Sequence, residues 1–306
     1  MLPTRSFRAA ADATLAAAVR EAYEGLPWSK ARELCRRGKV HVNGALETDG
    51  ARRVSKGDAI AVQPSAPRVD DGVFTDARVV HVDRHVVVVD KPAGIMSVPF
   101  EPGDKDTLVD RVRIWLRRRG DGQGAELGAV QRLDKDTTGL LVFARTLAAK
   151  RELQQQFRKH SIERRYRALV HGAVKRAQKV ETDLIRDRGD GLRGSYGHFR
   201  KPRGPLPSDA QHAITHIAPV EALRDATMVE CRLETGRQHQ IRIHLSEIGN
   251  PLIGEPVYIR DFAGERIAAP RPMLHAAVLG FEHPANGKPM RFERELPQDM
   301  AEVVER

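Results

Sequence analysis

The loop around Asp134 is the first place in the sequence where a side chain could do chemistry. The stretch AVQRLDKDTTGLLVFAR, residues 129–145, sets Asp134 two positions after Arg132 and just before a Thr-Thr-Gly turn. The unbroken apolar run 140–144 that follows predicts a buried strand. A single acidic group in a tight loop at the mouth of a buried strand is a candidate catalytic carboxylate.

A second unusual segment is LETGRQHQIRIHLSEIGNPLIGEPVY, residues 233–258. Ile241, Leu245 and Ile248 are spaced four and three apart and predict one apolar helical stripe, which a Gly-Asn-Pro sequence ends. Arg242 lies next to that stripe. An arginine there either extends its head to solvent or needs an acidic partner if it is covered, and the residues alone favour the first.

Motifs for a metal ion or a nucleotide are absent from the sequence. His239 and His244 are five apart, whereas two ligands on one helical face come four apart. Cys35 and Cys231 stand alone, without the spacing of a zinc site. There is no glycine-rich phosphate loop, no GxGxxG after a strand and no serine-hydrolase elbow. We therefore expect ordinary side chains to carry any chemistry, with no metal and no cofactor.

The composition points to a polyanionic partner. The chain has 306 residues, enough for a large domain plus a small one, and a formal net charge of +10. That charge favours nucleic acid, although many arginine-rich proteins carry such a charge without a functional meaning. The two isolated cysteines predict a reducing compartment, and we read no signal peptide or membrane span. We expect a cytoplasmic protein, monomeric by default.

Residues 1–64 predict a small basic module. A helix over 13–22 is followed by a second helix with Ser29 as its N-cap, and then by a hairpin that turns at Asn43-Gly44. Basic side chains crowd the second helix: Lys30, Arg32, Arg36, Arg37 and Lys39. Over residues 7–64 this pattern resembles the S-four-like RNA-binding module. The resemblance implies that the helix and hairpin present these side chains to RNA phosphates.

The rest of the chain predicts a second, larger domain over 75–306, after a linker rich in Pro, Asp and Gly over 65–74. Valine-rich and other apolar runs predict several strands, and the stretch 146–160 is the clearest helix, capped by Thr146. Strands dominate without alternating regularly with helices, which favours an α+β fold with a mixed, mainly antiparallel sheet. The arginine-rich stretch 186–212 is either a second surface for phosphate or a mobile insertion.

Five segments together resemble pseudouridine synthases of the RluA type. They are DKPAGI, QRLDKDTTGLLVFA, YRALVHG, the segment ETGRQHQIRIHL with IGNPLIGEPVY, and RPMLHAAVLGFEHPANGKPMRFERELPQDM. They occur in the family's order and cover nearly all of 75–300. The resemblance implies the pseudouridine synthase fold and isomerisation of uridine in structured RNA. Large-subunit ribosomal RNA is the favoured substrate, and transfer RNA is the alternative.

The resemblance also implies a role for each of five residues. Asp134 is the catalytic aspartate, and Arg132 helps to extrude the target uridine. Tyr166 stacks on the uracil ring, Arg242 forms a salt bridge with Asp134, and Leu274 lines the apolar pocket. The sequence departs from the family in having Gln131 where a histidine is usual and Thr138 where a serine is usual. The first departure affects details of RNA contact and leaves the aspartate unchanged.

The implied reaction breaks the glycosidic bond of uridine, turns the uracil and rejoins it through carbon 5. Asp134 would attack the anomeric carbon or remove a neighbouring sugar proton, and either route requires an ionised carboxylate kept charged by Arg242. One alternative is a non-catalytic RNA-binding or ribosome-assembly factor. Another is a nucleoside hydrolase or glycosidase, which would need a second well-placed carboxylate.

Overall fold

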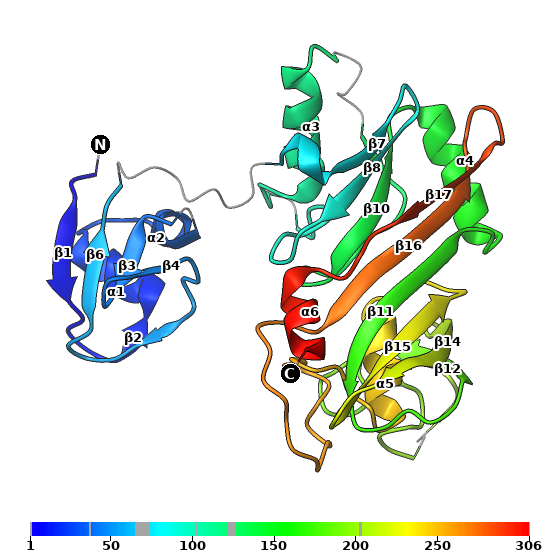
Figure 1. Ribbon diagram of the computed structural model, residues 1–306. Coiled ribbons are helices and arrows are strands. Elements are labelled where there is room, and N and C mark those ends of the chain that lie inside the picture. Colours follow the sequence, from blue (N-terminus) through cyan, green and yellow to red (C-terminus); the bar gives the residue numbers. More distant parts are fainter. Residues whose placement is uncertain are drawn as a thin grey trace. The chain divides into compact units, whose positions relative to one another are not determined.

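The computed structural model describes residues 2–36, 38–64, 74–101, 103–121, 127–201 and 204–305, apart from the side chains of Arg36 and Leu46. The chain divides into two units, Met1–Val73 and Phe74–Arg306 (Figure 1). Phe74 packs edge-on against Trp115, with ring centroids 6.1 Å apart, in the core of the larger unit. It therefore belongs to that unit, not to the linker in which we expected it, and 65–73 lie outside the described residues.

The smaller unit has two helices and two small sheets. In chain order its elements are β1 (Arg5–Arg8), β2 (Ala13–Thr14), α1 (Leu15–Ala22), α2 (Trp28–Arg36), β3 (Val40–Val42), β4 (Ala45–Glu47), β5 (Arg53–Val54) and β6 (Ala59–Val62). The larger sheet has the antiparallel order β1-β6-β3-β4, and β2 pairs with β5. Apolar side chains from both helices and from β3, β5 and β6 form one core.

Local sequence rules explain most of this unit. Asn43 and Gly44 both adopt positive φ, 52° and 83°, between paired Val42 and Ala45. This confirms the predicted two-residue turn, because its geometry needs residues that tolerate the left-handed region. The predicted cap at Ser29 is wrong. Helix α2 begins one residue earlier, and the Pro27 carbonyl accepts the first backbone hydrogen bonds.

The larger unit is built on one sheet of eleven strands. Its elements are η1 (Asp76–Arg78), β7 (Val79–Val82), β8 (Val86–Lys91), α3 (Leu108–Arg118), β9 (Gly128–Ala129), β10 (Thr138–Ala144), α4 (Leu147–Arg158), β11 (Glu163–His171), β12 (Gln178–Ile185), β13 (Gly194–Ser195), β14 (Gln211–Ala222), β15 (Ala226–Leu233), α5 (Gln240–Glu247), β16 (Leu274–Glu282), β17 (Pro289–Glu293) and α6 (Gln298–Val304). The strand order is β13-β12-β14-β15-β11-β16-β10-β8-β7, with β17 on β16 and β9 on β10. Among the described strands, only β10 and β16 pair in parallel, which confirms the predicted mixed, mainly antiparallel sheet.

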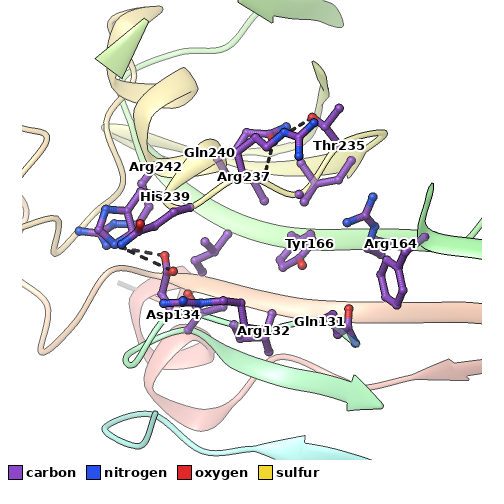
Figure 2. Close-up of a pocket in the computed structure, with 18 of the residues that line it drawn as sticks. Gln131, Arg132, Asp134, Arg164, Tyr166, Thr235, Arg237, His239, Gln240 and Arg242 are labelled. Carbon is purple, nitrogen blue, oxygen red and sulfur yellow. Dashed lines mark hydrogen bonds and ion pairs between the residues drawn. The ribbon is translucent and has the colours of Figure 1, made fainter. Parts of the chain in front are cut away.

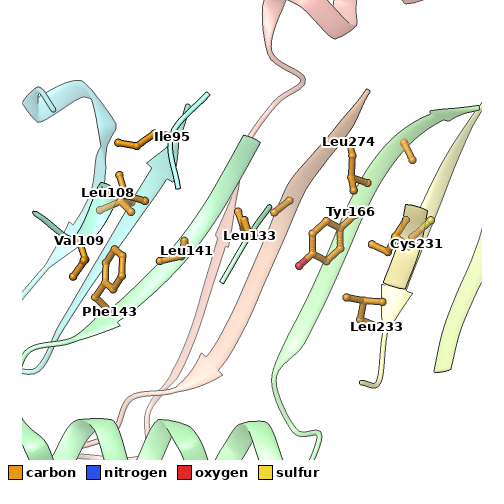
Figure 3. Packing of buried hydrophobic residues seen from close by; sticks show 14 of the residues in the cluster. Ile95, Leu108, Val109, Leu133, Leu141, Phe143, Tyr166, Cys231, Leu233 and Leu274 are labelled. Atoms are coloured by element: carbon orange, nitrogen blue, oxygen red, sulfur yellow. The ribbon is translucent and has the colours of Figure 1, made fainter. Parts of the chain in front are cut away.

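The centre of this sheet is covered on both faces. Leu141 and Phe143 of β10 lie in one core with residues of α3 (Figure 3). Leu140 and Val142 belong to another core, together with residues of α4. Successive side chains of a strand alternate between faces, so a strand buried on both faces reads as a continuous apolar run. Thr146 caps α4 by accepting a hydrogen bond from the Ala149 amide, as predicted.

The segment 186–212 is more ordered than the sequence indicated, since it contains β13 and the start of β14. Arg188 is buried and paired with Asp190, so it does not contribute to a phosphate surface, the first of the two alternatives for this stretch. Arg203 lies outside the described residues. Within the described ranges, no helix has both the length and the apolar character needed to cross a membrane.

Candidate active site

A cleft of about 630 Å³ in the larger unit brings all five predicted residues of this unit together. Its lining includes Asp134 and Arg132 from the loop between β9 and β10, Tyr166 from β11, Arg242 from α5 and Leu274 from β16. Figure 2 shows Asp134 near Arg242 at one end of the cleft, and Tyr166, on β11, further along the cleft. Four segments that are distant in the sequence therefore meet in one pocket.

Lys91 stabilises the Asp134 loop through hydrogen bonds to its backbone. Its side chain is fully buried, and its ammonium group donates to the carbonyls of Pro92, Lys135 and Thr137 at 3.0, 2.7 and 2.8 Å. The Thr137 amide also donates to the Asp134 carbonyl at 3.1 Å, which closes a turn. Burial lowers the pKa of Lys91 to about 7, against the opposing charges of Asp136 and Asp134.

Two further contacts fix the ends of the loop. The Ser97 hydroxyl donates to the Leu133 carbonyl at 2.8 Å and accepts from the Leu133 amide at 3.0 Å. Gly139 has a φ of +107°, and a Cβ there would lie 2.3 Å from the carbonyl oxygen of Ala276 in the parallel strand β16. Only glycine permits this approach, so the Thr-Thr-Gly turn of the sequence is a packing requirement.

Arg242 lies between two carboxylates. It donates two hydrogen bonds to Glu255, at 2.8 and 2.7 Å, while its Nη1 atom lies 3.7 Å from Oδ2 of Asp134. The expected ion pair with Asp134 is therefore present, but the primary partner is Glu255, which the sequence analysis missed. Burial works against the charge of Arg242, yet the hydrogen bonds and charge of Glu255, together with Asp134, raise its pKa.

The position of Arg242 also corrects our expectation for its helix. Residues 240–245 of α5 are all buried, so the helix has no solvent face onto which Arg242 could extend, and this residue is only 8% exposed. The side chain of Glu255 is fully buried beneath it, and its pKa is lowered: burial raises it, but the paired Arg242 outweighs that effect. The two charges satisfy each other inside the protein.

His239 and Tyr258 complete this end of the cleft. Nε2 of His239 lies 4.0 Å from Oδ1 of Asp134, and its Nδ1 atom is 2.8 Å from the Tyr258 hydroxyl. Burial lowers the pKa of His239, which favours the neutral ring at pH 7. Burial also raises the pKa of Tyr258 to about 12, so its hydroxyl stays protonated. Arg242 is thus the permanent cation beside Asp134.

Tyr166 and Leu274 serve the core and the cleft at once. Both belong to the buried cluster drawn in Figure 3, and both line the cleft. Tyr166 is 7% exposed, and burial raises the pKa of its hydroxyl. The Gln131 side chain has a buried amide nitrogen without a partner in the same lining.

The lining of the cleft is strongly cationic. Five arginines line it, against a single carboxylate, that of Asp134: Arg132, Arg158, Arg164, Arg237 and Arg242. Arg132 is exposed and makes no ion pair within the part of the chain that the structure describes. Such a lining attracts an anionic polymer.

The predicted RNA contacts of the smaller unit have mixed outcomes. Lys30 is exposed and pairs with Glu33 at 3.0 Å, and Arg32 is exposed. Lys39 departs from the prediction, because it is only 7% exposed and cannot reach a phosphate as it stands. The Arg36 side chain and Arg37 lie outside the described residues. Trp28, exposed at 45%, has the guanidinium carbons of Arg20 and Arg32 at 4.9 and 5.9 Å from its ring centroid.

Comparisons with known proteins decide the family. A family model described as RNA pseudouridylate synthase matches residues 85–247, and these include Asp134, Tyr166 and Arg242. The chain belongs to this family. Ribosomal large subunit pseudouridine synthase D of Zymomonas mobilis is 38% identical over 268 residues, which cover 84% of this chain and 81% of that protein. The RNA pseudouridine synthase YlyB of Bacillus subtilis, itself uncharacterized, is 34% identical over 288 residues, or 91% and 89% of the two chains.

Solved structures agree on the fold of this pseudouridine synthase. The human RNA pseudouridylate synthase domain containing 4 has a TM-score of 0.60 at 21% identity, and covers 75% of this chain and 92% of its own. The human RNA pseudouridylate synthase domain containing 1 has a TM-score of 0.53 at 21% identity, and covers 74% of this chain and 92% of its own. The predicted family, the α+β fold and an RNA-modifying isomerase are thereby confirmed. The roles of individual residues stay predictions.

Proposed function

We propose that this RNA pseudouridine synthase isomerises uridine in large-subunit ribosomal RNA, with Asp134 as its catalytic carboxylate and without a cofactor. The observation that carries the proposal is the meeting of Asp134, Arg242 and Tyr166 in one arginine-lined cleft. The choice of RNA rests on relatives whose names specify the large ribosomal subunit. Among the described residues, no group of three or more His, Cys, Asp or Glu could hold a metal ion.

In the proposed reaction Asp134 acts on the ribose of a uridine turned into the cleft. Its carboxylate attacks C1′ or removes the adjacent sugar proton, and the bond from C1′ to N1 breaks. The uracil then turns on the Tyr166 ring and forms a bond from C5 to C1′. On the first route this bond displaces the Asp134 carboxylate from C1′, and on the second route Asp134 returns the proton to the sugar. The proton on C5 is lost and N1 gains one, so atoms and electrons balance within one nucleotide.

Arg242 supports this chemistry through charge and position. The buried pair with Glu255 fixes the guanidinium, which leaves Nη1 directed at Asp134 at 3.7 Å. A fixed cation favours the ionised carboxylate without having to reorganise during the reaction. A hydrolase mechanism lacks its second acid, because Asp134 is the only carboxylate among the described residues that line the cleft.

Extrusion of the uridine from its stack costs roughly a few kcal/mol. Stacking on Tyr166 offsets roughly 1–3 kcal/mol of that cost. Arg132, exposed and without an ion-pair partner in the described ranges, occupies the gap that the uridine leaves. We expect these two residues to act on binding and flipping and Asp134 on bond breakage.

The smaller unit serves, in this proposal, as an S-four-like RNA-binding module. Arg32 and Lys30 contact phosphates, and the exposed Trp28 ring, flanked by Arg20 and Arg32, offers a surface on which an RNA base stacks. We expect the enzyme to be a cytoplasmic monomer. Both of its cysteines are free and buried, as suits a reducing compartment.

Identification of the product tests the proposed function. Purified protein is incubated with large-subunit ribosomal RNA, and with transfer RNA in parallel, and pseudouridine is mapped by its specific chemical labelling. We expect labelled sites in ribosomal RNA with no change in RNA mass. Release of free uracil would indicate a hydrolase. Tight RNA binding with no labelled site in either RNA would indicate a non-catalytic assembly factor.

A further inference from the structure

Arg164 is a buried cation in the same cleft as Asp134. It lies two residues before Tyr166 on β11, so both side chains project from the same face of the strand. Arg164 is 7% exposed and lines the cleft. Figure 2 shows it on the side of Tyr166 away from Asp134, and the charges of both groups act on the pKa of Tyr166.

The contacts of Arg164 fix its head without neutralising it. Nη2 donates to the Glu234 carbonyl at 2.7 Å, and the guanidinium lies 5.4 Å from the centroid of the Phe157 ring. Its Nε atom is buried and has no hydrogen-bond partner among the described residues. No carboxylate among the described residues forms an ion pair with it. Burial lowers the pKa of Arg164, and the nearby charge of Arg237 acts in the same direction.

A buried guanidinium without a counter-ion is costly, because its charge has lost water and gained no opposite charge. The charge of Arg237, which also lines the cleft, adds to the positive potential beside Arg164. His160 lines the cleft as well, and its Nδ1 atom lies 2.6 Å from the same Glu234 carbonyl. This end of the cleft is therefore built for an anion, whereas at the other end Glu255 already compensates Arg242.

We propose that Arg164 binds a phosphodiester of the substrate RNA adjacent to the target uridine. Residues two apart on a strand are separated by roughly 6.6 Å, so the backbone of a nucleotide that stacks on Tyr166 lies within reach of Arg164. The bound phosphate supplies the missing counter-ion and sets how the uridine enters the cleft. The inference rests on the proposed function, since it takes the RNA of that reaction as its ligand.

Salt-dependent RNA binding tests this site, with Arg164→Met, Arg164→Lys and Arg165→Met compared with the wild type. Arg165 is a matched control, because it lies on the opposite face of β11 and pairs with Glu163 and Glu230, at 2.7 and 3.1 Å. In Arg165→Met, Glu163 keeps Arg291 as a partner and Glu230 keeps Arg167. We expect Arg164→Met to weaken binding roughly 10- to 100-fold. Its slope of log affinity against log salt should fall by about 0.7 to 0.9, the value for one phosphate contact.

Arg164→Lys should keep most of the wild-type slope of log affinity against log salt. Arg165→Met should match the wild type in both RNA affinity and this slope. Melting temperatures show whether each variant is folded. An unchanged slope in folded Arg164→Met, or an equal loss in Arg165→Met, would overturn the inference.

Neutral methylphosphonate linkages, placed one at a time around the mapped uridine, locate the phosphate. One linkage within two nucleotides should weaken binding by the wild type and have no further effect on Arg164→Met. Equal effects on both proteins at every position would overturn the site. If the slope result for Arg164→Met holds while the wild type forms no pseudouridine, the phosphate site stands and the proposed reaction fails.

Discussion

Arg242 in the larger unit and Arg32 in the smaller one are both arginines on a helix, but their surroundings differ. Arg242 is buried, bonded twice to Glu255 and 3.7 Å from Asp134. Arg32 is exposed, and its described contact is with the Trp28 ring. A cation that must act on one carboxylate has to be held in place, while a cation that holds RNA phosphates needs only to be accessible. Substitutions of the buried and of the exposed residues should therefore differ in their effects.

The largest expected effect after loss of the aspartate itself comes from Arg242. Arg242→Met leaves Glu255 as an unpaired buried charge, which should lower the free energy of unfolding by about 3–5 kcal/mol. Turnover should fall by at least ~100-fold, since a fixed charge at the reacting carboxylate is lost. Urea unfolding and single-turnover assays measure the two effects.

The double variant Arg242→Met with Glu255→Gln separates those effects. With both charges gone, most of the lost stability should return, whereas turnover should stay low and RNA affinity should stay within about threefold of the wild type. Recovery of turnover together with stability would show that Arg242 has only a structural role.

Lys91→Met tests the support of the Asp134 loop. Three backbone carbonyls lose their donor, and each unsatisfied buried acceptor costs roughly 1–3 kcal/mol. We expect a loss of about 3 kcal/mol in stability with a marked drop in turnover. Lys56→Met in the smaller unit, where Lys56 is exposed, is the control and should change neither quantity.

A fall in pH should destabilise the larger unit more than the smaller one. Burial lowers the pKa of His244 and of His275, both in the larger unit, to about 4. The unfolded chain, with a histidine pKa near 6.5, therefore binds more protons between pH 6.5 and 4, and stability is lost as pH falls through that window. Each histidine should cost the larger unit about 2 kcal/mol at pH 5 relative to pH 7.

The two tryptophans report this difference separately, because Trp115 is buried in the larger unit and Trp28 belongs to the smaller one. In Trp28→Phe, the remaining fluorescence should show a lower urea midpoint at pH 5. In Trp115→Phe, whose fluorescence comes from the smaller unit, the urea midpoint should change less between pH 7 and pH 5. His244→Gln should weaken the dependence of the larger unit's urea midpoint on pH. Equal changes of the midpoint in Trp28→Phe and Trp115→Phe would contradict the assignment of the acid sensitivity to the larger unit.

How much the sequence predicted depends on whether local rules decide the structure. The turn at Asn43-Gly44, the cap at Thr146 and the buried strand after Asp134 were predictable, because each depends on backbone preference or side-chain periodicity. The meeting of Asp134, Tyr166 and Arg242 was expected only through the family resemblance. Periodicity alone gives no information on which loops converge.

The misses arose where burial overrides local pattern. The residues alone favoured a solvent-exposed Arg242, but residues 240–245 of α5 are all buried, and only the family resemblance predicted the pair with Asp134. Glu255 was overlooked because a lone carboxylate in an apolar loop carries no spacing signal, although such a residue near a covered arginine is a natural partner. The role of Lys91 carries no signal in the sequence either, because two of its three carbonyl contacts, those with Lys135 and Thr137, are made to a loop more than forty residues away.

The smallest expected effect concerns Trp28. In Trp115→Phe, Trp28 is the only tryptophan, and its fluorescence should be quenched by ribosomal RNA as a base stacks on it. Trp28→Ala should weaken RNA binding by roughly 1–3 kcal/mol, with turnover at saturating RNA unchanged. Leu147→Ala, at an exposed apolar position of the larger unit, is the control and should leave RNA affinity as it is. Absence of quenching would remove Trp28 from the RNA surface.

The most direct measurement of the central claim is pseudouridine formation by Asp134→Asn under saturating RNA, compared with Asp136→Asn in the same loop. The account predicts that Asp134→Asn forms no detectable pseudouridine while it binds RNA with wild-type affinity and keeps its melting temperature, and that Asp136→Asn remains active. Wild-type product formation by Asp134→Asn would contradict the account.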